Sequence, residues 1–393
     1  MIVLYYTSTH FLDVAIETIQ SIKQNVELHV VIEISPNSKK STIVDVEHLN
    51  NYKDIEDCEE VLGIVKWNYL KKYFEGVASV RFLIHKNKRM FSPESYRTAN
   101  KLGKHIKKLK VDIIHFDTIT ERAFGLYPYI RSKKIFITIH DPKAHSGEYS
   151  WKKLIRRFVF FRLAAGYFFY SNFACNQFRK YYPSIVTPTY VIRFQPTTYI
   201  SQFLEKERLG HTILFFGRLS FYKGIDMLLK AIPNVLEKFP DEKFIIAGNP
   251  ELNYKIELKN INQYQNNIQF ITKYLSTDEL IKCIQNAKFV VCPYRDATQS
   301  GVLMTSFAAG KMVVATNVGA FPEYIEDNVN GLLAEPTTEA IADRIIEALE
   351  NEKYKEIEKK IISFYSEEIN CYNQNCILNA YQLNNLPKRL TEL

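Results

Sequence analysis

The sequence FFGRLSFYKGID, residues 215–226, joins the end of an apolar run to the beginning of a helical pattern. A turn between a strand and a helix needs glycine at most, yet this turn also holds two cations, Arg218 and Lys223, along with Gly217 and Gly224. A guanidinium group binds phosphate oxygens as a two-pronged donor, and an ammonium group binds them as a point charge. We therefore interpret the turn as a diphosphate site, although a solvent-exposed loop with ordinary surface charges would have the same composition.

Short apolar runs alternate with longer amphipathic segments along the whole chain. The runs are rich in β-branched and aromatic residues and are apolar throughout, which is typical of parallel strands that are buried on both faces. The expected strands are 2–6, 27–34, 80–85, 111–116, 134–140 and 189–194 in the first half, and 212–217, 243–248, 268–271, 288–293 and 312–316 in the second. The pattern predicts an α/β fold with two Rossmann-like, doubly wound domains that face a cleft, and it directs attention to the loops that follow the strands.

The length of the chain agrees with two domains. With 393 residues, of which 46% are hydrophobic, it is too long for one ordinary domain and can bury a large core. We expect a first domain over residues 1–194, a polar linker over 195–210 and a second domain over 211–365. A helical segment over 366–393 is expected to pack back on the first domain.

The formal net charge is +8, and the basic residues gather in segments 85–89, 101–110 and 151–170. The last segment interleaves cations with aromatic side chains. Its residues 151–162 could lie on an anionic membrane surface, or they could form a core helix whose cationic face is solvated. A membrane span is not expected, because Arg162 interrupts an apolar run that is already short. Nucleic acid is not expected as a partner either, since no groove-reading module or zinc-ligand spacing is present.

The cysteines and the first residues bear on the cellular compartment. Six cysteines are scattered without metal-ligand or redox spacing, which is typical of reduced thiols. The opening MIVLYYTSTH lacks the charged start and the cleavage site of a signal peptide and is typical of a buried strand. Both features predict a cytoplasmic protein, with peripheral attachment to the inner face of the plasma membrane if segment 151–162 binds lipid.

A second helix start, within residues 292–316, is also suited to bind an anion. Ser300 is a good capping residue for a helix running to about Ala309, and Gly301 leaves the amides of the first turn open to a ligand. A helix start carries unpaired N–H groups and the positive end of the helix dipole, so an anion can bind there without a basic side chain. Plain capping accounts for Ser300, but it accounts less well for the adjacent Gln299 and Gly301.

These stretches together resemble the retaining glycosyltransferases of family 4, which have the GT-B fold. The resemblance rests on FFGRLSFYKGID, the QSGV helix start, AAGKMVVATNVGAFPE and DNVNGLLAEP, in the family's order, and it covers the second domain. It implies transfer of a sugar from a nucleotide-diphosphate donor without a metal ion or other cofactor. It further implies that domain 211–365 binds the donor and that domain 1–194 lies on the acceptor side.

The resemblance also assigns roles to individual residues. Arg218 and Lys223 match the cations that bind the donor diphosphate, and Tyr274 lies where the family contacts the base. The family usually carries two glutamates with seven residues between them, and Ala297 and Thr305 stand at their positions here. A subset of the family with QSGV also lacks them, so the departure leaves the ribose contact and the donor nucleotide open. The donor-binding residues implied are Gly217, Gln299, Ser300, Gly301, Val302, Tyr274 and Thr305.

The first domain resembles the family less closely. His140, at the end of the strand 134–140, matches a histidine that faces the donor sugar, and it joins Arg218 and Lys223 as a candidate catalytic residue. Asp141 and His145 lie in the same loop, and His10 follows the first strand, so we interpret these three as acceptor-side contacts. A histidine at a strand end can equally be a structural residue. Its position beyond a strand of an α/β sheet favours the functional interpretation.

The predicted function is that of a retaining hexosyltransferase, which acts on a glycan or a lipid-linked acceptor in bacterial surface polysaccharide synthesis. Preorganised cations and amides would stabilise the charge that develops on the leaving phosphate. No pair of carboxylates is recognisable as the nucleophile and acid of a glycosidase, so a covalent sugar–enzyme intermediate has no obvious candidate. The resemblance implies that the leaving phosphate itself accepts the proton of the attacking hydroxyl. Two alternatives stay open: a nucleotide-sugar epimerase, and a non-catalytic scaffold subunit that binds nucleotide sugar but has lost activity along with the carboxylates at positions 297 and 305.

Overall fold

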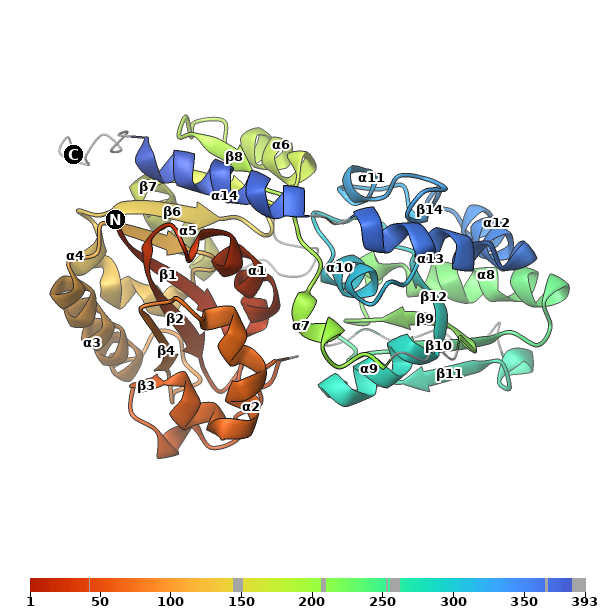
Figure 1. Cartoon of the computed structure of the whole chain (residues 1–393), viewed down its shortest axis with the longest axis horizontal. Coiled ribbons are helices and arrows are strands. Elements are labelled where there is room, and N and C mark those ends of the chain that lie inside the picture. Colours follow the sequence, from red (N-terminus) through yellow and green to blue (C-terminus); the bar gives the residue numbers. More distant parts are fainter. Residues whose placement is uncertain are drawn as a thin grey trace. The chain divides into compact units, whose positions relative to one another are not determined.

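The computed structural model describes residues 1–41, 43–143, 151–205, 210–251, 254, 262–364 and 367–383. The chain divides into two compact units, one made of Met1–Arg193 and Glu368–Leu393 and the other of Phe194–Glu367, and each contains one sheet (Figure 1). The described part of segment 195–210, which was expected to be a linker, lies in the second unit. It forms the short helix α7 (Thr198–Ser201), whose Tyr199 and Ile200 are buried, and this burial is what ties the segment to the unit.

The first unit contains an eight-stranded sheet with the strand order β3-β4-β2-β1-β5-β6-β7-β8. Neighbouring strands are parallel, apart from β3, which runs antiparallel to β4 at one edge. The strands are β1 (Ile2–Ser8), β2 (Glu27–Ile34), β3 (Ile55–Asp57), β4 (Ser79–Ile84), β5 (Ile113–Phe116), β6 (Lys134–Thr138), β7 (Ala164–Phe169) and β8 (Thr189–Val191). The sheet confirms the predicted parallel architecture of this half.

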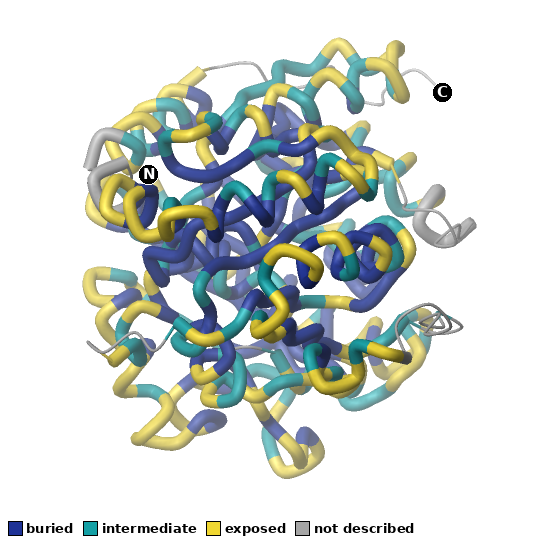
Figure 2. The backbone as a smooth tube through the Cα atoms, turned by 90° about the vertical axis from the view of Figure 1, so that its right-hand side faces the viewer, coloured by how far each residue is buried: buried dark blue, intermediate teal, exposed yellow. Residues whose placement is uncertain are grey.

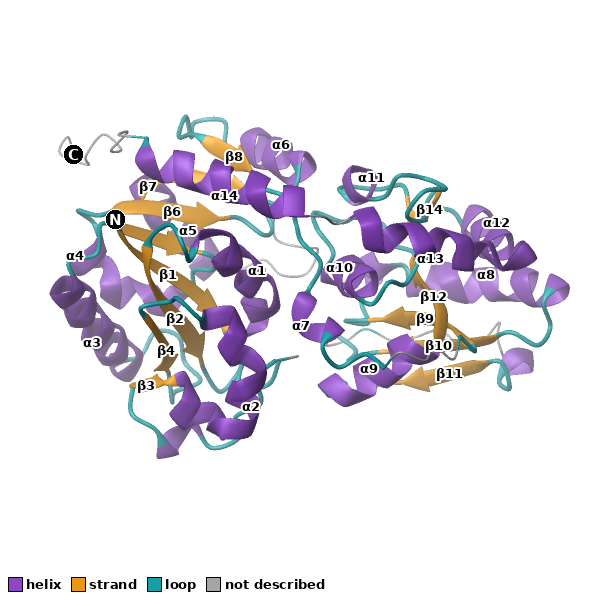
Figure 3. Cartoon of the chain, viewed as in Figure 1, coloured by secondary structure: helices purple, strands orange, loops and turns teal. Residues whose placement is uncertain are grey.

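Helices pack on both faces of this sheet (Figure 3). They are α1 (Leu12–Ile22), α2 (Cys58–Phe74), α3 (Pro93–Leu109), α4 (Tyr127–Ile130), α5 (Trp151–Leu163), α6 (Asn172–Tyr181) and α14 (Glu367–Gln382). The carboxyl-terminal helix α14 contacts the first unit through Tyr381, whose buried hydroxyl lies 2.6 Å from Nδ1 of His115 in β5. Residues at the two ends of the chain therefore share one core.

In the sequence, segment 151–170 is a single basic and aromatic stretch, but the structure divides it into a helix and a strand. The helix α5 ends at Leu163, and Ala164–Phe169 continues as the wholly buried strand β7 between β6 and β8. The small residues at its start permit close packing on β6, because a Cβ at Gly166 would lie 2.8 Å from Cε1 of Phe136. The basic surface of this segment is therefore confined to α5.

The second unit contains a six-stranded parallel sheet with the order β11-β10-β9-β12-β13-β14. Its strands are β9 (Thr212–Phe216), β10 (Lys243–Ala247), β11 (Ile268–Ile271), β12 (Ala287–Cys292), β13 (Val313–Thr316) and β14 (Leu332–Ala334). Besides α7, its helices are α8 (Ile225–Lys238), α9 (Thr277–Asn286), α10 (Gly301–Ala308), α11 (Phe321–Tyr324), α12 (Thr338–Leu349) and α13 (Lys353–Phe364). In both units most strands are buried and most helices keep an exposed face (Figure 2).

In each sheet the strand order reverses at one point, and that point positions the candidate site. The reversal falls between β1 and β5 in the first unit and between β9 and β12 in the second. Ligands of open α/β sheets bind beyond the carboxyl ends of the strands at such a reversal. The loops after β9 and β12 contain the two phosphate-binding stretches that the sequence predicts.

Candidate active site

The loop after β9 lies against the start of α10. Gly217 has a φ of +117°, and a Cβ at this position would lie 3.1 Å from Cγ2 of Val302. Gly224, which precedes α8, has a φ of +67°, and a Cβ there would come within 1.8 Å of the carbonyl oxygen of Pro293. Glycine suits both positions because each has a positive φ, and at Gly224 a Cβ would also clash with the backbone that follows β12.

Lys223 is buried between these two loops. Its Nζ lies 3.7 Å from the centre of the Tyr294 ring and 5.1 Å from that of Tyr222, in cation–π geometry. The hydroxyl of Ser300 lies 3.5 Å from the hydroxyl of Tyr294, so Tyr294 connects the ammonium group to the start of α10. Burial raises the pKa of Tyr294 well above its usual value, which keeps this phenol neutral. Lys223 is thus the cation that the fold places beside the helix start.

The start of α10 has the features of an anion site. Ser300 caps the helix as predicted, because its Oγ accepts a hydrogen bond from the backbone N–H of Leu303 at 3.3 Å. Gly301 is exposed, and a Cβ there would meet no atom within 4 Å. Gln299 precedes the cap and is half-buried. The amides of the first turn are therefore open to a ligand on the side where Gly301 has no side chain.

The remaining donor-side residues are less closely grouped. Arg218 is exposed in the loop after β9. Tyr274 is exposed beyond β11, which β10 separates from β9. Thr305 is buried within α10, and Ala297 is buried where its carbonyl oxygen accepts a hydrogen bond from the N–H of Ala320 at 2.7 Å. The structure brings Gly217, Lys223, Ser300 and Val302 together and places Tyr274 further along the sheet edge.

An ion pair that the sequence analysis missed holds the same two loops. Arg295 donates from Nη1 and Nη2 to the two carboxylate oxygens of Asp226, at 2.7 and 2.6 Å. Nη1 also donates to the carbonyl oxygen of Phe221, and the guanidinium group lies 4.2 Å from the centre of the Phe221 ring. Partial burial acts to raise the pKa of Asp226, but its hydrogen bonds with Arg295 outweigh burial and lower it. In the sequence, the only local signal for this ion pair is that a basic residue, Arg295, lies close to a proline, Pro293.

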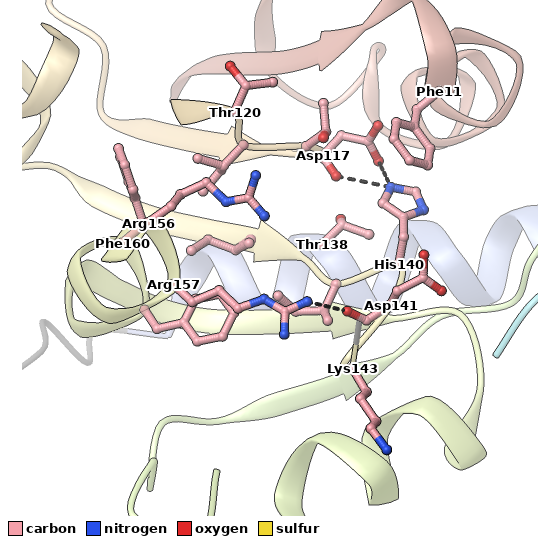
Figure 4. A pocket seen from close by; sticks show the side chains of 15 residues that line it. Phe11, Asp117, Thr120, Thr138, His140, Asp141, Lys143, Arg156, Arg157 and Phe160 are labelled. Atoms are coloured by element: carbon pink, nitrogen blue, oxygen red, sulfur yellow. Dashed lines mark hydrogen bonds and ion pairs between the residues drawn. The ribbon is translucent and has the colours of Figure 1, made fainter. Parts of the chain in front are cut away.

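In the first unit, His140 is buried beyond the end of β6 (Figure 4). Its Nε2 lies 3.3 Å from Oδ1 of Asp117 and 3.0 Å from the carbonyl oxygen of the same residue. Oδ2 of Asp117 accepts a hydrogen bond from Oγ1 of Thr7 at 2.7 Å, and the ring of Phe11 stacks on the imidazole with 4.1 Å between ring centres. The sequence analysis identified His140 but missed Asp117 and Phe11, which follow the neighbouring strands β5 and β1.

The charge of Asp117 decides the protonation of His140. Burial alone would lower the pKa of His140, but the negative charge and hydrogen bonds of Asp117 raise it above its ordinary value. His115, one strand away, shows the contrast, because burial lowers its pKa to about 4 and keeps it neutral. The two buried histidines therefore differ in the direction of their pKa shifts, which is upward for His140 and downward for His115.

A neighbouring carboxyl group gives a stability prediction. Burial raises the pKa of Asp13, in the first turn of α1, from 3.8 to about 6. The folded state favours the neutral acid, so this contribution to stability is complete below the ordinary pKa and is lost as the pH rises through about 6. Asp13→Asn should therefore raise the free energy of unfolding above that pH, by at most about 3 kcal/mol, and change it little at about pH 4. Urea unfolding at both pH values measures this, with the exposed Asp241→Asn as control. A gain of equal size at both values would contradict the assignment.

A cavity of about 270 Å³ adjoins His140 (Figure 4). Three cations line it, Lys143, Arg156 and Arg157, together with Asp117 and residues 118–120 of the loop after β5. Arg156 pairs with Glu121 at 3.3 Å.

The acceptor-side residues expected from the sequence lie differently with respect to this cavity. Asp141 lines it, and its carbonyl oxygen accepts a hydrogen bond from Nη2 of Arg157 at 2.9 Å. His10 lies in the 3₁₀ turn Thr9–Phe11, from which Phe11 rather than His10 lines the cavity. His145 lies outside the described residues.

Within the described ranges, no three or more His, Cys, Asp or Glu side chains are grouped so that they could hold a metal ion. In that same part of the chain, none of the helices combines the length and the apolar character needed to cross a membrane.

The sequence of the second unit matches a known family. Residues 199–364 match the family model described as Glycosyl transferases group 1. The second unit belongs to this family.

Curated relatives of this chain include an uncharacterized glycosyltransferase of Methanocaldococcus jannaschii, 34% identical over 32% of each chain. A D-inositol 3-phosphate glycosyltransferase of Corynebacterium diphtheriae is 30% identical over 36% of each chain. The phosphatidyl-myo-inositol mannosyltransferase of Mycobacterium leprae is 30% identical over 38% of this chain and 40% of the relative. The match covers about a third of the length of each of the first two relatives.

Solved structures extend the similarity to both units. A glycosyltransferase of Rickettsia africae aligns over 98% of this chain and 99% of its own, with a TM-score of 0.61 and 17% identity. Anabaena HepE in complex with UDP-glucose aligns over 98% and 100%, with a TM-score of 0.64 and 15% identity. At these identities the likeness concerns the fold, and it confirms that the group 1 domain is part of a GT-B chain.

Proposed function

We propose that this protein is a glycosyltransferase that moves a hexosyl group from a nucleotide-diphosphate donor to a glycan or lipid-linked acceptor. The observation that carries the proposal is the contact between the loop after β9 and the start of α10. The loop after β9 carries the buried Lys223, and the start of α10 carries the open amides beside Gly301. Both lie where the strand order of the second unit reverses, and the match of residues 199–364 to the group 1 family supports the same activity.

The residues of the second unit suit the departure of a nucleoside diphosphate. Cleavage of the bond between a sugar and a diphosphate builds negative charge on the leaving oxygens. Lys223, the exposed Arg218 and the first-turn amides of α10 would stabilise that charge. Lys223 is fixed before reaction, because the pair of Arg295 with Asp226 holds the loop that carries it. Such preorganised groups lower the barrier without reorganisation at the moment of transfer.

We propose that the transfer proceeds with retention. The positions where the resembling family has its paired glutamates hold Ala297 and Thr305, both buried. A covalent sugar intermediate on either residue is therefore not proposed. The leaving phosphate takes the proton of the attacking hydroxyl on the same face, and His140 is the candidate catalytic residue of the first unit. No metal ion takes part in this proposal.

Helix α5 supports a contact with an anionic membrane. Phe158 and Ile155 are exposed, and the guanidinium group of Arg162 lies 3.5 Å from the centre of the Phe158 ring. Adjacent aromatic and cationic side chains suit the interface between head groups and acyl chains. We place the protein in the cytoplasm, at the inner face of a bacterial membrane, in the synthesis of a surface polysaccharide.

Gly301→Ala tests the donor site without disturbing the fold. A Cβ at this position meets no protein atom, and alanine favours a helix more than glycine does, so stability should be unchanged or slightly higher. The added methyl group would occupy the space in which an anion approaches the amides. We expect the dissociation constant of the donor to rise about tenfold, measured by calorimetry. Thr338→Ala, at the first position of α12, is the matched control. Unchanged donor affinity in Gly301→Ala would contradict an anion site at α10.

The activity itself is tested with a panel of nucleotide sugars. A donor present at a hundred times its dissociation constant should stabilise the protein by about 2.7 kcal/mol, which a thermal shift detects. Release of nucleoside diphosphate that depends on an acceptor would then identify a transferase. Conversion of the donor sugar without any acceptor would indicate an epimerase instead, and binding without turnover would indicate a scaffold subunit.

A further inference from the structure

A second hollow, of about 720 Å³, lies next to the cavity beside His140. It lies between α5 and residues 182–187, and its apolar lining consists of Ile155, Phe158, Phe161, Tyr182, Ile185 and Val186. Its rim is unusually apolar for a protein surface. Val186 is 90% exposed, Phe158 60% and Ile155 44%. Clustered exposed apolar side chains of this kind mark a surface that binds a partner or a ligand.

The two hollows adjoin, because Arg157 and Phe161 line both of them. Arg157 is held in place between them. Its Nη1 donates to the carbonyl oxygen of Pro142 at 2.9 Å and to the hydroxyl of Tyr182 at 2.8 Å, and its Nη2 donates to the carbonyl oxygen of Asp141. A ligand could therefore extend from one hollow to the other past a fixed positive charge.

The two hollows differ in chemistry. The cavity beside His140 has three cationic side chains in its walls, Lys143, Arg156 and Arg157, and two carboxylates, Asp117 and Asp141. Asp117 pairs with His140, and the cationic side chains of the lining outnumber the carboxylates. An anionic group such as a phosphate suits this end. The hollow under Val186 offers hydrocarbon and aromatic side chains, and an apolar chain gains by covering them. A free glycan would occupy only the polar cavity and would leave the apolar rim in water.

We propose that the acceptor is a lipid with an anionic head, and that the first unit binds it across both hollows. The head, with the hydroxyl that receives the sugar, lies in the cavity beside His140. The hydrocarbon tail passes Arg157 and lies between α5 and residues 182–187. This inference rests on the proposed glycosyltransferase function and selects the lipid-linked acceptor over the free glycan.

Calorimetric titration with three small probes tests the inference. Decyl phosphate, below the concentration at which it forms micelles, carries both an anionic head and a tail. Inorganic phosphate carries the head alone, and decyl maltoside carries the tail on a neutral head. We expect decyl phosphate to bind about tenfold or more tighter than either of the others. Equal affinities for decyl phosphate and decyl maltoside, or no binding of decyl phosphate, would overturn the proposal.

Two valine variants locate the binding site. Val186→Asp introduces a negative charge at the rim of the apolar hollow, and it should weaken decyl phosphate binding about tenfold. Val65→Asp on α2 is the matched control, since Val65 is 72% exposed and lines neither hollow. Because both side chains are exposed, we expect both variants to keep the melting temperature of the wild type. Equal weakening in the two variants would show nonspecific adsorption of the lipid and contradict the proposed site.

The donor-induced thermal shift separates this inference from the proposed function. We expect the shift to be the same in Val186→Asp, Val65→Asp and the wild type, because the donor residues lie in the other unit. Absence of decyl phosphate binding from the wild type, together with a normal donor shift, would refute the lipid site alone. Absence of the donor shift from the wild type would refute the proposed function instead.

Discussion

Lys223→Met is expected to lower kcat/KM for sugar transfer by about 10²–10³, the usual cost of removing one preorganised charge-stabilising group. Methionine retains much of the apolar stem that packs on Tyr294, whereas the charge that would face the leaving diphosphate is lost. The loss should appear both in nucleoside diphosphate affinity and in kcat. Steady-state kinetics with the donor found in the nucleotide-sugar panel, together with calorimetry, measures both quantities.

Lys230→Met provides the matched control for this experiment. Lys230 is exposed in α8, the helix that follows the same loop, so its removal should leave kcat/KM unchanged. Melting temperatures of both variants show whether the fold is retained. Full activity in a folded Lys223→Met variant would show that the buried ammonium group takes no part in the mechanism.

His140→Ala is expected to lower kcat by about 10²–10⁴, the range found when a positioned catalytic side chain is removed. Its effect on the affinity for the nucleoside diphosphate alone should be small, because the diphosphate residues belong to the other unit. This separation distinguishes His140 from Lys223, whose replacement impairs binding as well. A loss of nucleoside diphosphate affinity equal to the loss of kcat would contradict the role given to His140.

Asp117→Asn tests how His140 is held. The carboxylate of Asp117 raises the pKa of His140, so the ion pair stabilises the folded state fully below the ordinary pKa of 6.5 and less as the pH rises through the raised pKa. The destabilisation caused by Asp117→Asn should therefore be larger at about pH 6 than well above the raised pKa. The apparent pKa of His140 in the pH–rate profile should also fall, so that the limb that reports it moves to lower pH. Equal destabilisation at every pH, with an unmoved profile, would assign Asp117 a structural role alone.

Most strands could be predicted from the sequence because parallel strands buried on both faces are apolar throughout. The expected ranges 27–34 and 268–271 coincide with β2 and β11. The strand β7 escaped detection because Ala164–Phe169 follows a helix directly, without a proline or a turn residue to mark the boundary. The edge strand β3 consists of the short sequence IED, which lacks the apolar pattern of a buried strand. Local sequence therefore indicates strands that have an apolar pattern and a marked boundary better than strands that lack either.

Part of the candidate site could also be predicted, because some of its features are local in the sequence. The glycines and cations after β9 and the capping serine of α10 are local signals, which can be recognised without knowing the fold. Tyr294 beneath Lys223, and Asp117 and Phe11 beside His140, depend on which strands become neighbours. That order, with β9 next to β12 and β1 next to β5, is decided by packing across the whole sheet. The chemistry of the loops could be predicted, but their partners could not.

The most direct measurement is a calorimetric titration of the wild-type protein with nucleoside diphosphates and with the monophosphates of the same bases. If the loop after β9 and the start of α10 bind two linked phosphoryl groups, one diphosphate should bind about tenfold or more tighter than its monophosphate. Equal affinity for the two, or no binding of any diphosphate, would contradict the diphosphate site on which the account depends.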